Sequence, residues 1–119
     1  MGILVTNNPL VTEQYKDKYM IEYIETDLHG VLTRVRDMIH KGHRLLTHPL
    51  MGSIKPNESP YKSIFLSDPV GTTDLKSVTI IEECIQAAGK FIEKDIPKQY
   101  LHDLQVVDLS LLRSAQVNR

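Results

Sequence analysis

Residues 26–42 read TDLHGVLTRVRDMIHKG and contain the clearest structural signal in the chain. The apolar side chains recur every three or four residues, as on the buried face of an amphipathic helix: Leu28, Val31, Leu32, Val35, Met38 and Ile39. Thr26 and Asp27 offer side-chain oxygens that can cap the first turn, and Gly42 can adopt the left-handed conformation that ends a helix. The stretch therefore predicts a helix over about 28–41.

Apolar runs rich in β-branched or aromatic residues predict strands on both sides of this helix. They lie at 2–6, 20–25, 44–47 and 63–67. A first helix is predicted over 9–17, capped by Asn8 and begun by Pro9, and a long helix follows Asp74 up to the break at 95–97. For 98–112 both helical and strand spacing fit, and we expect a short helix followed by a last strand.

The alternation of strands with amphipathic helices predicts an α/β fold. We expect one domain over residues 1–119, built in three layers with helices on both faces of a mostly parallel sheet of four to five strands. This arrangement resembles flavodoxin-like or Rossmann-like folds. In the long helix, Cys84 lies on or beside the apolar stripe, so it is expected to be a small buried hydrophobe rather than a reactive thiol.

Charge and composition exclude several classes of protein. The chain has 14 basic and 15 acidic residues and a net charge of −1, so no overall field favours nucleic acid or an anionic membrane. Its single cysteine cannot form an internal disulfide, and it has no apolar stretch long enough for a signal peptide or a membrane span. These features predict a cytoplasmic protein.

The motifs that usually mark cofactor binding or catalysis are missing from the sequence. It contains neither a dinucleotide-binding glycine pattern nor a phosphate-binding loop, and no paired-cysteine, nucleophile-elbow or metal-helix motif. His40 and His43 have a spacing seen among metal ligands, but they flank the predicted helix end at Gly42 and no further ligands complete a set. The sequence therefore predicts no metal site, names no cofactor and assigns no catalytic residue.

A candidate binding surface follows from the predicted sheet, because ligands of parallel α/β proteins sit beyond the carboxyl ends of the strands. The segment 48–60 starts at one such end, lacks periodicity and holds three prolines. Irregular connections of that length commonly bind or gate something, and the group from Gly52 to Asn57 can hold a phosphate or carboxylate. The candidate residues are Asn7, Asn8, Thr47, His48, Gly52, Ser53, Lys55, Asn57, Glu58, Tyr61 and Lys62.

Several segments together resemble one known family, and the resemblance covers nearly the whole chain. They are VTNNPLV at 5–11, VRDMIHKGH at 35–43 and LLTHPL at 45–50, with further likeness over 52–63 and 107–111. The chain resembles the GrdX family, small proteins encoded with the glycine, sarcosine and betaine reductase systems of amino-acid-fermenting anaerobic bacteria. The resemblance implies an accessory or regulatory role in the cytoplasm beside the reductase, and it supplies no catalytic residues.

Three hypotheses about function remain open at this point. The first is a noncatalytic accessory protein that binds a reductase component or a small anionic metabolite through the 48–62 loop. The second is a small enzyme in which His48 acts as acid or base while Ser53 or Lys55 holds an anion. The third is a structural subunit with an exposed face that dimerises; the sequence leaves the oligomeric state open.

Overall fold

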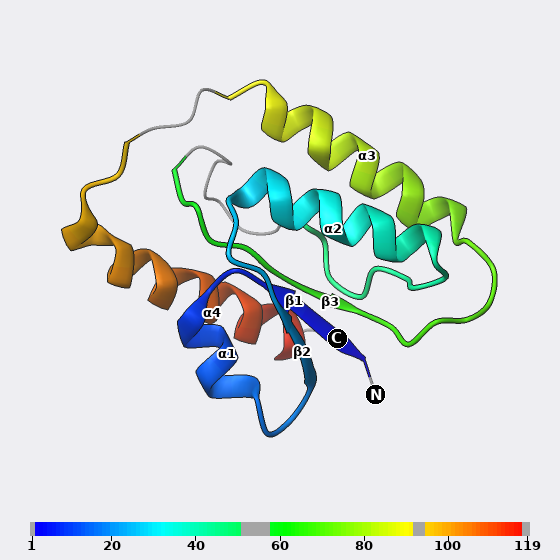
Figure 1. Ribbon diagram of the computed structural model, residues 1–119, viewed down its shortest axis with the longest axis horizontal. Coiled ribbons are helices and arrows are strands. Elements are labelled where there is room, and N and C mark those ends of the chain that lie inside the picture. Colours follow the sequence, from blue (N-terminus) through cyan, green and yellow to red (C-terminus); the bar gives the residue numbers. More distant parts are fainter. Residues whose placement is uncertain (1, 51–57, 92–94, 118–119) are drawn as a thin grey trace.

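The computed structural model describes residues 2–50, 58–91 and 95–117, which form three strands and four α-helices. In chain order they are β1 (Ile3–Thr6), α1 (Pro9–Tyr15), β2 (Met20–Tyr23), α2 (Leu28–His40), β3 (Ser63–Leu66), α3 (Leu75–Gly89), the short 3-10 turn η1 (Lys98–Tyr100) and α4 (Leu101–Val117). The sheet lies between two pairs of helices, α2 with α3 and α1 with α4 (Figure 1). The predicted α/β class, with helices on both faces, is confirmed.

The sheet has the strand order β2-β1-β3 and mixed direction. β1 and β2 are parallel, with Thr6 opposite Tyr23, whereas β1 and β3 are antiparallel, with Thr6 opposite Ser63. The prediction of a mostly parallel sheet of four to five strands was therefore wrong for the described residues. Flavodoxin-like and Rossmann-like sheets are mostly parallel, so these strand directions give that resemblance no support.

The strand predicted at 44–47 is reduced to a single antiparallel bridge between Leu45 and Leu66. The segment does run beside β3, because the Leu46 N–H donates to the Phe65 carbonyl. The Ser67 N–H also donates to the Arg44 carbonyl, but side chains take the neighbouring N–H groups. The Leu45 N–H donates to Ser77 Oγ of α3, and the Phe65 N–H donates to Thr47 Oγ1 instead of a main-chain carbonyl.

The strand predicted at the end of the chain was also wrong, because residues 101–117 form the continuous helix α4. The apolar spacing fits both structures, and packing decides between them. In the helix, Leu109 and Leu112 are buried together on the sheet, while Val106 and Val107 face solvent. Burying a leucine contributes about 2 kcal/mol, so the helical stripe outweighs the local preference of two valines for a strand.

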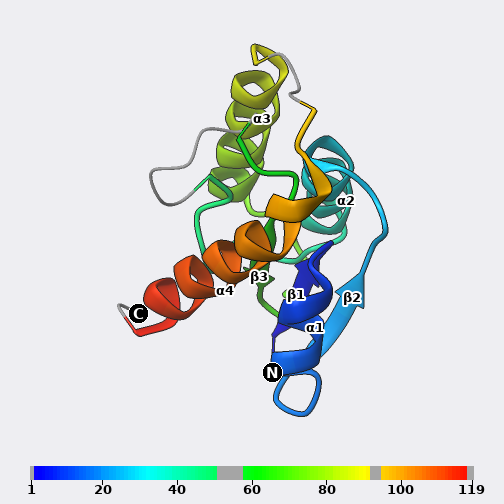
Figure 2. The ribbon, with the colours of Figure 1, turned by 90° about the vertical axis from the view of Figure 1, so that its left-hand side faces the viewer.

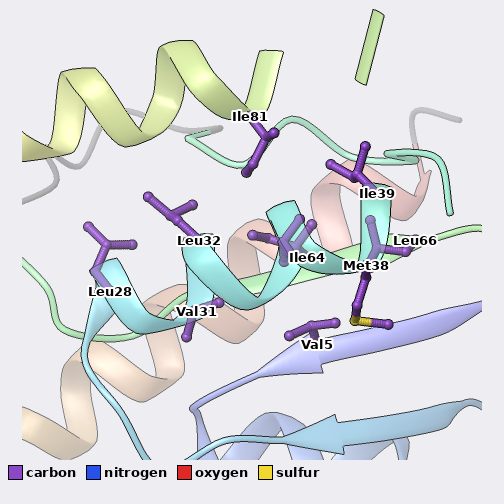
Figure 3. Packing of buried hydrophobic residues seen from close by; sticks show 10 residues of the cluster. Val5, Leu28, Val31, Leu32, Met38, Ile39, Ile64, Leu66 and Ile81 are labelled. Atoms are coloured by element: carbon purple, nitrogen blue, oxygen red, sulfur yellow. The ribbon is translucent and has the colours of Figure 1, made fainter. Parts of the chain in front are cut away.

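The two faces of the sheet carry separate apolar clusters because successive strand residues point to opposite sides. Val5, Ile64 and Leu66 pack against α2 and α3 (Figure 3). Leu4 and Phe65 pack against α1 and α4 on the other side, and Figure 2 shows the same layers from another direction. None of the helices in the described segments is both long and apolar enough to span a membrane.

The helix ends follow the capping residues read from the sequence. Asn8 Oδ1 accepts the Leu10 N–H, Asp27 Oδ1 accepts the Gly30 N–H, and Asp74 Oδ2 accepts the Ser77 N–H. Gly42 follows the end of α2 with a φ of +108°, and its N–H donates to the Ile39 carbonyl. This left-handed glycine confirms the predicted stop of the best-defined helix.

Candidate functional site

The direction of the strands decides which segments meet at each edge of the sheet. β1 and β2 are parallel, so Asn7 and Thr26 follow them at the same edge. β3 runs the other way, so this edge receives the residues that precede it, Pro60 to Lys62. The polar pair after β3, Ser67 and Asp68, lies at the opposite edge. The carboxyl ends of the strands therefore lie at two opposite edges, and they do not form the single surface that a mostly parallel sheet would give.

Asn7 joins the three segments that meet at the first edge. Its Nδ2 donates to the Thr26 carbonyl over 2.8 Å and to the Pro60 carbonyl over 2.7 Å. Its Oδ1 accepts the Lys62 N–H over 2.8 Å. Asn7 is 5% exposed, and its amide is already engaged on both sides. Its role in the structure is to hold the end of β1 against the returning chain.

Asn8 and Asp108 form a second buried junction, between β1 and α4. Asn8 Nδ2 donates to the Gln105 carbonyl and to Asp108 Oδ2, each over 3.0 Å. Ser63 Oγ also donates to Asp108 Oδ2, over 2.8 Å, and lies 2.7 Å from Thr6 Oγ1. Asp108 is 5% exposed. A carboxylate can be held there because hydrogen bonds from Ser63 of β3 and from the cap residue Asn8 replace its water.

Lys62 lies on the opposite face of the sheet from this carboxylate network. Side chains alternate along a strand, which puts it on the same face as Ile64, toward α2 and α3. It is 9% exposed. Burial lowers the pKa of the Lys62 ammonium, and the fields of Asp108 and Cys84 oppose that shift. No ion-pair partner of Lys62 occurs among the described side chains.

Cys84 is buried in α3, as its place beside the apolar stripe predicted. It is 3% exposed, and burial raises the pKa of its thiol, with a smaller contribution from Glu83 in the same direction. A raised pKa keeps the thiol protonated near neutral pH, where the protonated form is a poor nucleophile. Cys84 is therefore a buried thiol of α3 without the features of a reactive cysteine.

A cleft of about 430 Å³ opens beside Asn7 at the first edge. It is lined by Asn7, Pro9, Tyr23, Glu25, Thr26, Pro60, Tyr61 and Leu101. Gln105 Nε2 of α4 donates to the Tyr61 hydroxyl over 3.0 Å, which fixes the position of that side chain. Thr26 packs directly against the backbone of Gly30. The contact is so close that a Cβ atom at Gly30 would lie 2.0 Å from Thr26 Oγ1. Hydrogen bonds and close packing therefore preform the walls of the cleft.

Thr47 and His48, where the chain enters the 48–62 loop, have roles outside the cleft. Thr47 is buried, and its hydroxyl accepts the Phe65 N–H as part of the sheet edge. His48 is exposed, and its Nδ1 accepts the Leu50 N–H over 3.1 Å. Neither lines the cleft. A ring nitrogen that accepts a main-chain N–H fixes the local turn of the loop.

Four of the candidate residues, Gly52, Ser53, Lys55 and Asn57, lie outside the described residues. Glu58 is described and exposed. Within 2–50, 58–91 and 95–117, no cluster of three or more histidine, cysteine or acidic side chains is arranged to hold a metal ion. Of the two histidines near the end of α2, His43 is buried and its Nδ1 lies 2.8 Å from the Ser67 carbonyl.

Sequence reasoning missed the residues that complete the cleft and its support. Pro9, Tyr23, Glu25 and Leu101 line the cleft but were not candidates. For Glu25 a signal existed, since it ends a predicted strand. Asp108 was visible as the one charge on an otherwise apolar helical stripe. A carboxylate at such a position is buried only with hydrogen-bonding partners, so it marks a polar network.

The described residues define a small three-layer α/β protein with a preformed cleft at one edge of a mixed sheet. Residues 3–116 match the family model described as GrdX-like protein. The chain belongs to this family, as the resemblance of its central segments indicated. Neither the curated proteins nor the solved structures include a match.

Proposed function

We propose that the protein is a noncatalytic accessory or regulatory component of the glycine, sarcosine and betaine reductase system, acting in the cytoplasm. In this proposal it binds a reductase component at the edge where β1 and β2 end and the 48–62 loop returns to the sheet. Membership of the GrdX-like family supports the context. The mode of action rests on the residues of the site.

The cleft beside Asn7 is the observation that carries this proposal. Its walls combine aromatic, aliphatic and polar groups from four separate segments, and such mixed surfaces suit partner recognition. The chemical groups of the described lining residues favour binding over bond breaking. They include no cysteine, histidine, serine or lysine. Apart from Glu25, the lining groups able to attack or to transfer a proton are the hydroxyls of Tyr23, Thr26 and Tyr61.

Of the two ligands considered at the outset, a partner protein fits the described residues better than a small anion. Lys62 has its ammonium on the far face of the sheet, and Lys55 lies outside the described residues. The charged group among the described residues of the cleft is a carboxylate, Glu25. The alternative of a small enzyme based on His48 receives no comparable support, because that imidazole does not line the cleft.

The proposal can be tested by capturing each purified reductase component on the immobilised protein. We expect one component to bind the wild type and to bind Tyr61→Leu at least about tenfold more weakly, because aromatic side chains often dominate interface energetics. The matched control is Leu75→Ala. Leu75 is 77% exposed at the start of α3, at the opposite edge of the sheet, and its truncation should leave capture unchanged. If no component binds the folded wild type, the proposal fails.

A further inference from the structure

The cleft beside Asn7 carries a negative charge, whereas the sequence predicted an anion-binding surface near it. Glu25 is the only charged residue among those described around it, and Tyr23 and Tyr61 contribute two aromatic rings. Glu25 is exposed, and no described lysine, arginine or histidine forms an ion pair with it. The cleft therefore has one carboxylate that no described cation neutralises, beside aromatic side chains.

Two kinds of group at this edge would attract an anion, the N–H groups at helix starts and the Lys62 ammonium, and those described below are capped or buried. Pro9 begins α1 and has no N–H, and the Leu10 N–H already donates to Asn8 Oδ1. At the start of α2, the Gly30 N–H donates to Asp27. Lys62 is buried on the other face of the sheet. These two capped N–H groups are therefore not available to an anion.

We infer that the cleft binds an organic cation, an ammonium or guanidinium group, beside the Glu25 carboxylate and the rings of Tyr23 and Tyr61. Carboxylates attract such groups directly, and aromatic rings attract them through the negative potential of their faces. Tyr61 is positioned for this by its hydrogen bond from Gln105, and Tyr23 by its place at the end of β2. The cation is either a lysine or arginine side chain of a partner, which rests on the proposed function, or a free amine.

The inference is tested with simple probes that separate charge from shape. Tetramethylammonium chloride is titrated into isotopically labelled protein while amide resonances are followed by NMR, and tert-butanol serves as a neutral probe of similar shape. We expect saturable shifts at 23–26 and 61–62 with the cation, with a dissociation constant on the order of millimolar. Glu25→Gln should weaken binding about fivefold, and Tyr61→Leu about threefold.

The control is Glu82→Gln, which removes another exposed carboxylate, from α3, and should leave the titration unchanged. The inference is overturned if tetramethylammonium gives no saturable shift at these residues, if tert-butanol binds as well, or if sodium acetate occupies the same residues more tightly. It is also overturned if Glu25→Gln binds the cation as the wild type does.

A second arm identifies the source of the cation and separates this inference from the proposed function. Purified reductase components are tested against wild type and Glu25→Gln. Capture that falls about fivefold in the variant supports a lysine or arginine side chain of the partner as the cation. Capture that is unchanged, while tetramethylammonium binding falls, supports a free amine. Tight capture with no cation binding by the wild type overturns the inference and leaves the accessory role standing.

Discussion

Asn7 Oδ1 accepts the Lys62 N–H over 2.8 Å, so an amide side chain extends the pairing of β1 and β3 past the last strand residues. The same side chain donates to Thr26 and Pro60. One residue thus sets the positions of two walls of the cleft. Its bonding is complete without any ligand, which assigns Asn7 to the architecture of the site rather than to recognition.

Replacing Asn7 with alanine should destabilise the fold by about 2–3 kcal/mol, because the buried Lys62 N–H and two partly buried carbonyls lose their partner. Asn7→Asp should be at least as costly, since a carboxylate would face the carbonyls of Thr26 and Pro60. Chemical denaturation measures both changes. The control is Gln86→Ala, an exposed amide of α3 that should change stability by less than about 0.5 kcal/mol. An Asn7→Ala variant as stable as this control would contradict the structural role of the Asn7 hydrogen bonds.

Asp108→Ala should cost about 2–4 kcal/mol, because Asn8 and Ser63 would both keep buried donors without an acceptor. Asp108→Asn should cost clearly less, since its remaining oxygen can accept both bonds. Thermal and chemical unfolding of the two variants give the comparison. Asp103 in the first turn of α4 is the exposed control, and its replacement by alanine should cost less than about 1 kcal/mol. Equal losses at 103 and 108 would argue against the buried network.

Lys62 should make stability rise with pH in the alkaline range. In the unfolded chain the amine keeps its proton up to about pH 10.4, whereas burial lowers the pKa of Lys62 in the folded protein. Between these two pKa values the unfolded state binds more protons, so raising the pH favours the folded state. Below both pKa values Lys62 is charged in either state, and the burial of that charge lowers the stability of the folded state.

The measurement is the difference in unfolding free energy between wild type and Lys62→Met, followed as the pH rises toward 10.4. We expect this difference to shift in favour of the wild type within that window, because methionine cannot titrate. Comparing the two proteins cancels the titration of the tyrosines, and carrying Cys84→Ala in both removes the thiol whose pKa is coupled to Lys62. The pair of wild type and Lys98→Met, at an exposed lysine, should show a flat difference. A flat difference for Lys62→Met as well would refute the burial of its charge.

Val35→Asp should prevent folding, because Val35 is fully buried in the core between α2 and the sheet. A carboxylate at that position loses its hydration without gaining a partner, and the loss should exceed about 4 kcal/mol. Circular dichroism and the dispersion of NMR resonances report folding directly. Asp37→Ala, two residues along at an exposed position, should remain folded. A soluble, cooperatively folded Val35→Asp protein would mean that the core is placed wrongly.

The helices α1, α2 and α3 could be predicted closely because their signals are local. The apolar stripe from Leu28 to Ile39 and the stop at Gly42 depend on residues a few positions apart, and both were confirmed. The direction of β3 could not be predicted in this way. It depends on how the connection from His48 to Pro60 returns the chain, and no local pattern encodes whether a strand joins its neighbour parallel or antiparallel.

The failures at 44–47 and 98–112 have a related cause. Whether Leu45 joins a full strand depends on Ser77, which lies 32 residues away and takes its N–H. Whether Val106 lies in a strand or a helix depends on the sheet face that Leu109 and Leu112 cover. The candidate site shares this limit. The rule that ligands sit beyond the carboxyl ends of parallel strands located Asn7, and it applies equally to Glu25 after β2. Tyr61 precedes β3, and it reaches this edge because β3 is antiparallel.

The most direct test of partner binding at this edge is hydrogen–deuterium exchange of the protein, alone and with a saturating amount of the reductase component that it captures. The account predicts slower exchange at 24–27 and 58–62, around the cleft, and unchanged exchange at 67–72, at the opposite edge of the sheet. Slower exchange confined to 67–72, with the amides around the cleft unaffected, would contradict it.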